Sequence, residues 1–320
     1  MFEASQLVFY YAISPVHMGA GSAIGAIDSP IQREVHTKHP MFAGSGLKGA
    51  LRHHFNRTWE RTDKKPNDLI NRIFGPDTGA SDFAGALSLS DAQLVALPVR
   101  SLKGGFAYVT SPLALARLHR LAVQAGTAPD WDVPTVAENK ALAASTNLLN
   151  DKTDKSKQLV LEAFEFVTDV DDKLKAIALW IAERALPGAG NQFFADKFKT
   201  DLVLLHDTDF GHFARHAMVV EPHVRINDES GTADDGRLFY VENLPPETLM
   251  VGLAQASIER FKKNSRTVES ADLLNAGQVL SHVFAGESNT TGISGKLLQI
   301  GGDATTGRGL VVVQSVPSSQ

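Results

Sequence analysis

One acidic residue stands alone in a stretch of small residues near the start of the chain. Asp28 is the only acid between Glu3 and Glu34, and basic residues and glycines follow it closely. The plain interpretation is structural, because an aspartate two residues before Pro30 can form a turn and bond a nearby N–H through its carboxylate. The pattern also raises the question of what chemistry would need a carboxylate among cations and flexible glycines.

The stretch "AGSGLKGALR" places glycines before a predicted helix. The N–H groups of a first helical turn lack partners and attract anions, and Lys48 and Arg52 lie four residues apart on one face. This arrangement could bind a phosphate. Most glycine-flanked helix starts only make a turn, however, and the GxxxxGK(S/T) pattern of nucleotide-hydrolysing P-loops is missing.

A second glycine-rich stretch, "GGDATTGRG", runs from Gly301 to Gly309 and carries two threonines and Arg308 before an apolar strand. Its composition alone favours a flexible hairpin. In "VRSLKGGFAYVT", Lys103 lies beside Phe106 and Tyr108, and such a mixture can grip a nucleic-acid backbone and stack a base. Strand alternation would place both rings on one face, which is more often core.

Composition and charge narrow the classes of function. The 320 residues are 43% hydrophobic and contain no cysteine, which excludes disulfides, thiolate zinc sites and cysteine nucleophiles and fits a reducing cytoplasm. A net charge of −5 argues against a free-standing nucleic-acid binder. Residues 33–65 nevertheless hold eight Lys/Arg against three acids, so we expect one cationic face on an acidic body. Glu3 stands where a signal peptide would be positive, and no apolar run could span a membrane, so we expect a soluble, uncleaved cytoplasmic protein.

Strand and helix patterns alternate along the chain. The predicted strands are 6–14, 86–99, 104–110, 158–168, 201–207, 217–226, 236–244 and two within 295–315, and the predicted helices are 45–60, 110–126, 171–188, 207–217 and 269–286. Ser45 is expected to cap the first helix, and residues 126–157 are expected to be irregular. The turn-rich residues between 226 and 236 predict a protruding hairpin. A duplicated ferredoxin-like α+β arrangement accommodates this order, although the pattern alone does not select it.

The segments "YAISPVHMGAGSAIGAIDSPIQREVHTKHPMFAGSGLKGALR", "PVRSLKGGFAYVTSPLALARL" and "GGDATTGRG" together resemble the RAMP family that forms the backbone of the Cmr effector complex. That complex is the type III-B CRISPR assembly that cleaves target RNA. The resemblance covers nearly the whole chain. The pair "DSPIQRE" and "GSGLKGALR" at this spacing is specific, whereas a glycine-rich terminal loop is shared by all RAMP proteins.

The resemblance implies an α+β fold with a ferredoxin-like or RRM-like core, a glycine-rich loop and a projecting thumb hairpin at about 219–245, within a single RAMP domain over 1–320. Family members stack head to tail on a guide RNA and cut the paired target at regular intervals. The implied partners are therefore guide RNA, target RNA, further copies of the chain and other Cmr subunits, with no membrane. An acidic hairpin tip fits docking on a basic neighbouring subunit better than gripping RNA.

The resemblance also places the catalytic aspartate of the family on Asp28. A carboxylate is a poor base at neutral pH, so its implied roles are to hold Mg²⁺ (or Mn²⁺) against the scissile phosphate, with RNA bound, or to orient the attacking 2′-hydroxyl. The implied RNA contacts are His17, Arg33, Ser45, Lys48, Arg52, Lys103, Gly301, Gly302, Thr306, Gly307 and Arg308.

Two alternatives stay open. The chain could be a non-catalytic RNA-binding scaffold in which Asp28 is structural. It could also be a metal-independent RAMP endonuclease that processes the guide precursor with a histidine such as His17. A chelator would separate these possibilities in a cleavage assay.

Overall fold

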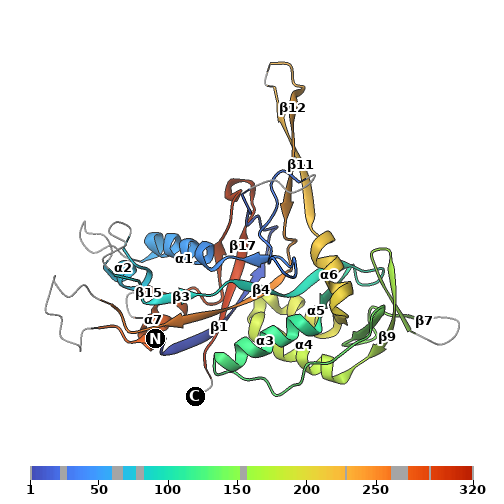
Figure 1. Cartoon of the computed structure of the whole chain (residues 1–320), viewed down its shortest axis with the longest axis horizontal. Helices are drawn as coiled ribbons and strands as arrows, with labels where there is room; N and C mark the ends of the chain where they lie inside the picture. The colour runs from blue at the N-terminus through green and yellow to red at the C-terminus, as the bar shows by residue number, and fades with distance from the viewer. Residues whose placement is uncertain are drawn as a thin grey trace.

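The computed structural model describes residues 2–21, 27–59, 68–76, 83–151, 157–227, 229–260, 273–287 and 290–318. A mixed sheet of 13 strands crosses this described part of the chain, in the order β16-β17-β1-β13-β4-β5-β10-β6-β9-β8-β7, with β2 beside β4 and β3 beside β13 (Figure 1). The strands are β1 (Ala4–Ala12), β2 (Met41–Phe42), β3 (Leu87–Leu89), β4 (Ala92–Arg100), β5 (Phe106–Thr110), β6 (Lys140–Ala143), β7 (Asn150–Asp151), β8 (Lys157–Leu161), β9 (Phe164–Val170), β10 (Leu202–Leu205), β13 (Leu249–Ala256), β16 (Lys296–Gln299) and β17 (Leu310–Val316).

The sheet is buried on both faces, as the alternation along β1 shows. Val8 and Tyr10 join one core, while Leu7, Phe9 and Tyr11 join the other, because successive strand residues point to opposite faces. The first core packs against α1 (Gly44–Thr58), α2 (Asp68–Phe74), α6 (Asp207–His216) and α7 (Ala276–Phe284), and the second against α3 (Pro112–Gln124), α4 (Asp172–Ala185) and α5 (Gln192–Asp201). The result is the predicted α+β fold.

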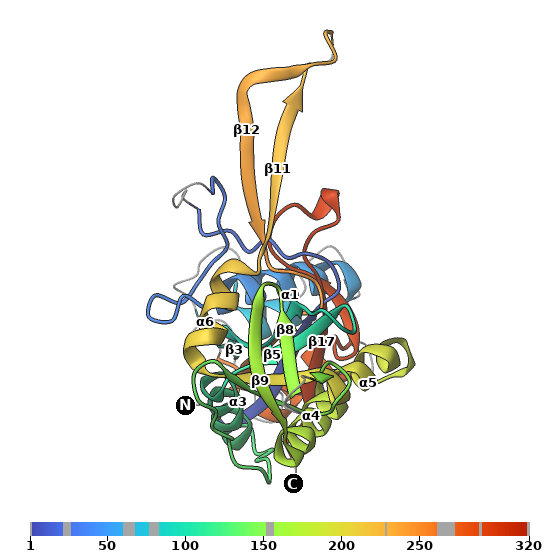
Figure 2. The same cartoon turned by 90° about the vertical axis from the view of Figure 1, so that its right-hand side faces the viewer.

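A two-stranded hairpin projects from this body, as both views show (Figures 1 and 2). It consists of β11 (Val219–Ile226) and β12 (Ala233–Asn243), which we call the thumb hairpin. The antiparallel register pairs Val224 with Leu238 and Pro222 with Tyr240. The predicted projecting hairpin is therefore present, and its foot enters the body next to the N-terminal third of the chain.

The structure corrects several predictions of local structure. Residues 86–99 form two strands, β3 and β4, instead of one. Residues 158–168 form β8 and β9 instead of one strand, because Glu162 adopts a left-handed backbone (φ +50°) and turns the chain without a glycine or proline signal. The stretch 126–157, which the sequence predicts to be irregular, contains β6 and β7. β6 is only four residues long, and its sequence KALA gives little strand signal. The last predicted helix begins only at Ala276, where Asn275 and Gln278 form a capping box. Its expected start at 269–272 lies outside the described residues.

Ser45 does not cap the first helix. Helix α1 begins at Gly44, after Ala43, and no side chain caps it through that position. The Gly44 N–H instead donates to Asp91 Oδ1 at 2.8 Å, so a carboxylate from the start of the neighbouring strand satisfies a first-turn donor. Within the described residues, no helix is long and apolar enough to cross a membrane.

Candidate functional site

Asp28 lies exposed at the foot of the thumb hairpin. The chain after it runs beside β12, where Ser29 N donates to Tyr240 O at 3.1 Å and Glu242 N donates to Ser29 O at 3.0 Å. The Asp28 Oδ2 atom accepts the Tyr240 N–H at 2.8 Å. No other donor of the described residues lies within hydrogen-bonding distance of this carboxylate. One oxygen therefore fixes the side chain, and Oδ1 of this exposed residue accepts no hydrogen bond from the described residues.

His17 contacts the residue after Asp28 and joins three parts of the chain. It is 8% exposed. Its Nδ1 lies 2.8 Å from Glu242 O, and because a carbonyl only accepts, Nδ1 carries the proton. The Nε2 atom lies 3.1 Å from the Ser29 hydroxyl, which can donate to it. The His17 carbonyl accepts Gly302 N–H at 2.9 Å. His17 thus ties the residue next to Asp28 to both the thumb hairpin and the glycine-rich loop.

A buried ion pair anchors the residues that follow Asp28. Glu242, 3% exposed, accepts Ile31 N–H through Oε2 at 3.0 Å and pairs through Oε1 with Arg33 Nη2 at 2.5 Å. Arg33 Nη1 also donates to Ala214 O at 2.7 Å, near the carboxyl end of α6. Both terminal nitrogens of Arg33 donate to protein acceptors, so its side chain links the residues that follow Asp28 to α6 and β12.

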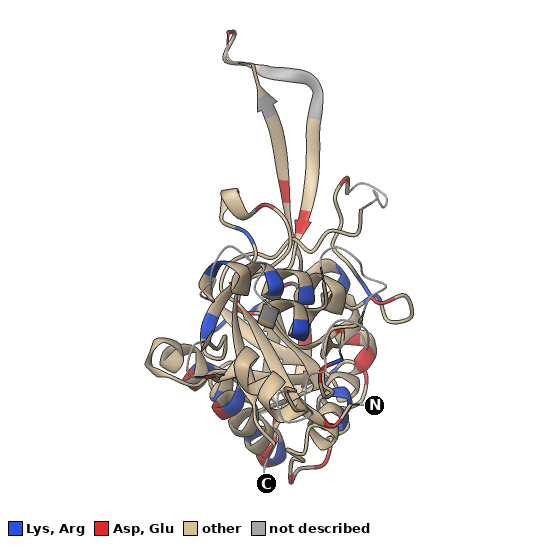
Figure 3. Cartoon of the chain, turned by 90° about the vertical axis from the view of Figure 1, so that its left-hand side faces the viewer, with Lys and Arg blue, Asp and Glu red and all other residues tan. Residues whose placement is uncertain are grey.

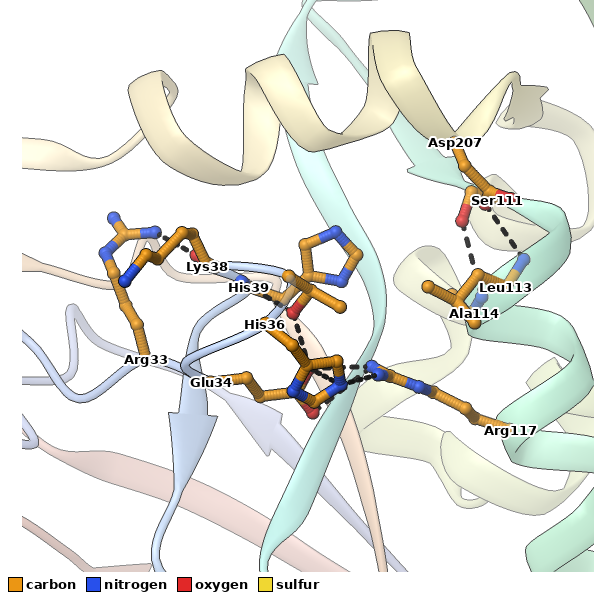
Figure 4. Close-up of polar contacts among 11 residues, drawn as sticks. Arg33, Glu34, His36, Lys38, His39, Ser111, Leu113, Ala114, Arg117 and Asp207 are labelled. Carbon is orange, nitrogen blue, oxygen red and sulfur yellow. Dashed lines mark hydrogen bonds and ion pairs between the residues drawn. The ribbon is translucent and has the colours of Figure 1, made fainter.

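The next residues form a tight turn that a second buried pair holds in place (Figure 4). Glu34 and Arg117 of α3 are each 8% exposed and lie 2.9 Å apart. His39 packs edge-on against Phe210 of α6. Burial, with the Arg117 guanidinium nearby, lowers the pKa of His39 to about 4. Residues 27–40, which we call the Asp28 segment, are therefore fixed at several buried points.

The glycine-rich loop (residues 301–309) approaches the same place from the other side. Its residues 301–307 are exposed. Gly301 has a φ of +70°, and a Cβ there would lie 2.2 Å from the His17 carbonyl oxygen, so only glycine fits. Gly307 has a φ of +81° with nothing within 4 Å of an added Cβ, and Thr306 Oγ1 donates to Asp303 O at 2.9 Å. Arg308 Nη2 contacts both carboxylate oxygens of Glu221 in β11, at 2.6 and 2.7 Å.

The cations of α1 contact the protein as well. Lys48 Nζ donates to Leu87 O at 2.8 Å, and burial, together with the Arg52 charge, lowers the pKa of Lys48. Arg52 donates to Gly75 O and to Asn71 Oδ1. Both partners of Arg52 lie on or just after α2, so this guanidinium fastens α2 to α1. Ser45 is exposed on the first turn.

The aromatic pair near Lys103 belongs mainly to the core. Tyr108 is fully buried, and its hydroxyl lies 2.8 Å from that of Tyr11. Phe106 lies under the Lys197 ammonium at 4.5 Å. Lys103 Nζ donates to Leu149 O at 2.5 Å. The structural interpretation of the two rings is confirmed for Tyr108.

The structure thus brings together some of the residues singled out from the sequence and separates others. Contacts at the thumb foot connect one set, which is His17, Asp28, Arg33, Gly301, Gly302 and Arg308. The contacts of Lys48, Arg52 and Lys103 run to other elements. Sequence reasoning missed Ser29, Tyr240, Glu221 and Glu242. A sequence feature that could have indicated the two glutamates is that one acidic residue lies near each end of the predicted hairpin. Figure 3 shows acids in red at the base of the projecting strands.

Comparisons with known proteins agree with this architecture. Residues 9–312 match the RAMP superfamily. The chain is 34% identical over 311 residues to the "CRISPR system Cmr endoribonuclease Cmr4" of Pyrococcus furiosus, covering 96% of this chain and 94% of that protein. The crystal structure of oligomeric Cmr4 from Pyrococcus furiosus superposes with a TM-score of 0.69 at 28% identity, over 99% of both chains.

The same fold occurs in a chain of the type III-B Cmr-beta complex bound to cognate target RNA, with a TM-score of 0.66 at 19% identity over 98% of both chains. The family match spans nearly the whole sequence, and the relative covers nearly its own full length. By sequence and by fold, this chain belongs to the RAMP superfamily.

Proposed function

We propose that this chain is a repeating backbone subunit of an RNA-guided, RNA-cleaving CRISPR complex of type III-B. It binds guide RNA and cleaves the paired target at regular intervals. The observation that carries the proposal is the exposed carboxylate of Asp28, fixed through one oxygen where the thumb hairpin, His17 and the glycine-rich loop meet. The 34% identity to a protein named as an endoribonuclease supports the same reading.

The Oδ1 atom of Asp28, which no described residue bonds, can accept a hydrogen bond from a target 2′-hydroxyl and direct its oxygen toward the adjacent phosphorus. The 2′-oxygen bonds to phosphorus, the bond to the 5′-oxygen breaks, the hydroxyl loses its proton and the leaving oxygen gains one. The products end in a 2′,3′-cyclic phosphate and begin with a 5′-hydroxyl. His17 positions Ser29 and has both ring nitrogens occupied, which speaks against the processing mechanism based on that histidine.

Asp28 could bind a divalent cation only if phosphate oxygens of bound RNA coordinate the same cation. The described residues contain no group of three or more His, Asp or Glu side chains that could hold a metal ion. Mg²⁺ is commonly held by one or two carboxylates together with substrate phosphates, so Asp28 Oδ1 and target phosphate oxygens form a reasonable donor set. The chemistry that Mg²⁺ or Mn²⁺ would supply there is stabilisation of the negative charge at the scissile phosphate.

We further propose that the guide backbone lies along the glycine-rich loop, α1 and the turn between β4 and β5. The contacting residues are Gly301, Gly302, Thr306, Gly307, Arg308, Ser45, Lys48 and Lys103. Lys48 and Lys103 each use one ammonium donor on a carbonyl, and an ammonium has three. For Arg33 and Arg52 we propose anchoring roles, because the protein engages their terminal nitrogens.

Further copies of the chain would stack head to tail in the cytoplasm, beside other Cmr subunits. Such a heterologous interface does not close on itself and builds a filament along the guide. The solved oligomeric Cmr4 supports self-assembly as a property of this kind of chain.

The central test replaces Asp28 by asparagine in the reconstituted complex with end-labelled target RNA. Asparagine keeps the shape and can still accept the Tyr240 N–H, but it is a far weaker metal ligand. Cleavage should fall at least about a hundredfold while target binding is retained. Wild-type cutting by Asp28→Asn would remove this residue from the mechanism.

Two controls separate the alternatives. A chelator should stop cutting, and a single deoxynucleotide at one cut position should block that cut alone. Cutting that survives the chelator would favour the metal-independent enzyme, and cutting at the deoxy position would identify water as the nucleophile. A wild-type complex that binds target RNA and never cuts it would leave the non-catalytic scaffold as the remaining interpretation.

A further inference from the structure

Glu221 stands at the foot of the thumb hairpin and holds Arg308 of the glycine-rich loop through a single nitrogen. Both contacts of the pair use Arg308 Nη2, at 2.7 Å to Oε1 and 2.6 Å to Oε2. Among the described residues, no acceptor lies within hydrogen-bonding distance of Arg308 Nη1 or Nε. An arginine fork offers five N–H donors, so most of this guanidinium remains available.

The pair is held from both sides. Asn243 Nδ2 donates to Glu221 Oε2 at 3.3 Å, which orients the carboxylate. The backbone around Arg308 is fixed because its carbonyl accepts Gln299 Nε2 at 2.6 Å and its N–H donates to Asp303 O at 3.2 Å. The Arg308 side chain is 24% exposed and that of Glu221 28%, so the guanidinium reaches the surface in a defined orientation.

The loop that leads into Arg308 is open to solvent. An added Cβ at Gly307 would meet nothing within 4 Å, and residues 301–307 are exposed. Because the Arg308 side chain is itself partly exposed and only its Nη2 is bonded to Glu221, a phosphate could reach its remaining N–H groups without displacing Glu221. A planar guanidinium that already has one donor fixed loses less freedom on binding a phosphate than a freely rotating one.

We propose that Glu221 is a positioning residue for the guide-backbone contact of Arg308. The carboxylate holds Nη2 and presents the remaining N–H groups to a phosphate of the guide RNA. The inference deepens the proposed function and rests on it. The competing reading is that Glu221 occupies Arg308 and must be displaced by RNA, in which case its removal would strengthen binding.

Two substitutions of equal length separate these readings. Glu221→Gln keeps an acceptor for Nη2, whereas Glu221→Met keeps the length and packing without one. Binding of a labelled single-stranded RNA of guide length to the full-length chain is measured by fluorescence anisotropy. Glu221→Met should bind roughly three- to tenfold more weakly than Glu221→Gln. Thermal unfolding of both variants checks that the thumb foot stays folded.

The same two variants are then measured with Arg308→Ala, where the Gln and Met versions should bind equally. A purely structural role for Glu221 predicts instead that Met remains weaker than Gln without Arg308, which would overturn the proposal. Equal binding of Gln and Met with Arg308 present, or tighter binding by Met, would overturn it as well. A wild-type chain that does not bind the RNA would overturn the proposed function, and this inference with it.

Discussion

The Asp28 segment and the glycine-rich loop both contact the foot of the thumb hairpin, but they are held there in different ways. The Asp28 segment is held by buried groups, with Glu242 against Arg33 and Glu34 against Arg117. The glycine-rich loop is exposed along residues 301–307, and the pair between Arg308 and Glu221 is partly open to solvent. One segment is fixed by buried contacts and the other presents its backbone.

The difference matches what each segment would do. A catalytic carboxylate must be placed accurately, because small displacements cost large factors in rate. A loop that contacts a phosphate backbone needs close approach and few side chains.

We expect the largest difference in loss of stability between substitutions of the two acids at the hairpin foot, Glu242 and Glu221. Glu242→Gln leaves the Arg33 charge unpaired in a mostly buried place, and should lower the free energy of unfolding by roughly 3–5 kcal/mol. Glu221→Gln removes a charge from a partly exposed pair and should cost about 1 kcal/mol or less. Urea unfolding midpoints at equal slope give both values. Equal losses would mean that the two segments are held alike.

Neighbouring glycines of the loop provide a second contrast. Gly301→Ala places a Cβ against the His17 carbonyl in a left-handed backbone, and should cost roughly 2–4 kcal/mol. At Gly302 an added Cβ lies 3.5 Å from His17 Cδ2, an ordinary contact, so Gly302→Ala should fold normally. Its RNA binding should nevertheless weaken if the guide backbone lies on this loop. Loss of stability in Gly302→Ala would contradict the predicted contrast.

Acid should loosen the Asp28 segment through His39. The pKa of His39 is about 4 in the folded chain against 6.5 unfolded, so between these values the unfolded chain binds a proton that the folded chain does not. Stability should therefore fall by roughly 2–3 kcal/mol as the pH drops from 6.5 to 4, with no further loss from this group below that.

The control is His39→Phe, which can keep the edge-on contact with Phe210 and cannot titrate. The difference in unfolding free energy between wild type and variant should change with pH over that window alone. A constant difference would assign the pH dependence to other groups. The glycine-rich loop contains no histidine, so no such titration is expected from it.

Local signals explain which parts of the fold could be predicted. Helix α3 has Ser111 as its cap, Pro112 at its start and Gly126 just after its end, and its predicted bounds hold within two residues. The hairpin and the two strands around the glycine-rich loop follow from alternation and turn residues. The turn at Glu162 was missed because its left-handed backbone has no glycine to mark it.

The site could be predicted only as separate residues. Asp28 bonds a backbone N–H 212 positions away, and Arg33 finds its carboxylate 209 positions away. Sequence spacing cannot show that a cation is already paired by so distant a partner. The basic run at 33–65 therefore predicted one cationic face, whereas Arg33 and Arg52 fasten elements of the fold, and residues 60–65 of the run lie outside the described residues.

The smallest expected effect is on the salt dependence of RNA binding, and it distinguishes cations that contact RNA from cations that hold the fold together. Each phosphate contact on single-stranded nucleic acid contributes about 0.7 to the slope of log affinity against log salt. Arg308→Ala and Lys48→Ala should each reduce the slope by about that amount, because these side chains keep donors for a phosphate. Arg33→Ala should leave the slope unchanged although it weakens folding, since its donors serve Glu242 and α6. Filter binding of guide-length RNA across a salt series measures all three. A reduced slope for Arg33→Ala would place RNA on the Asp28 segment itself, and the distinction between a fixed segment and a contacting loop would fail.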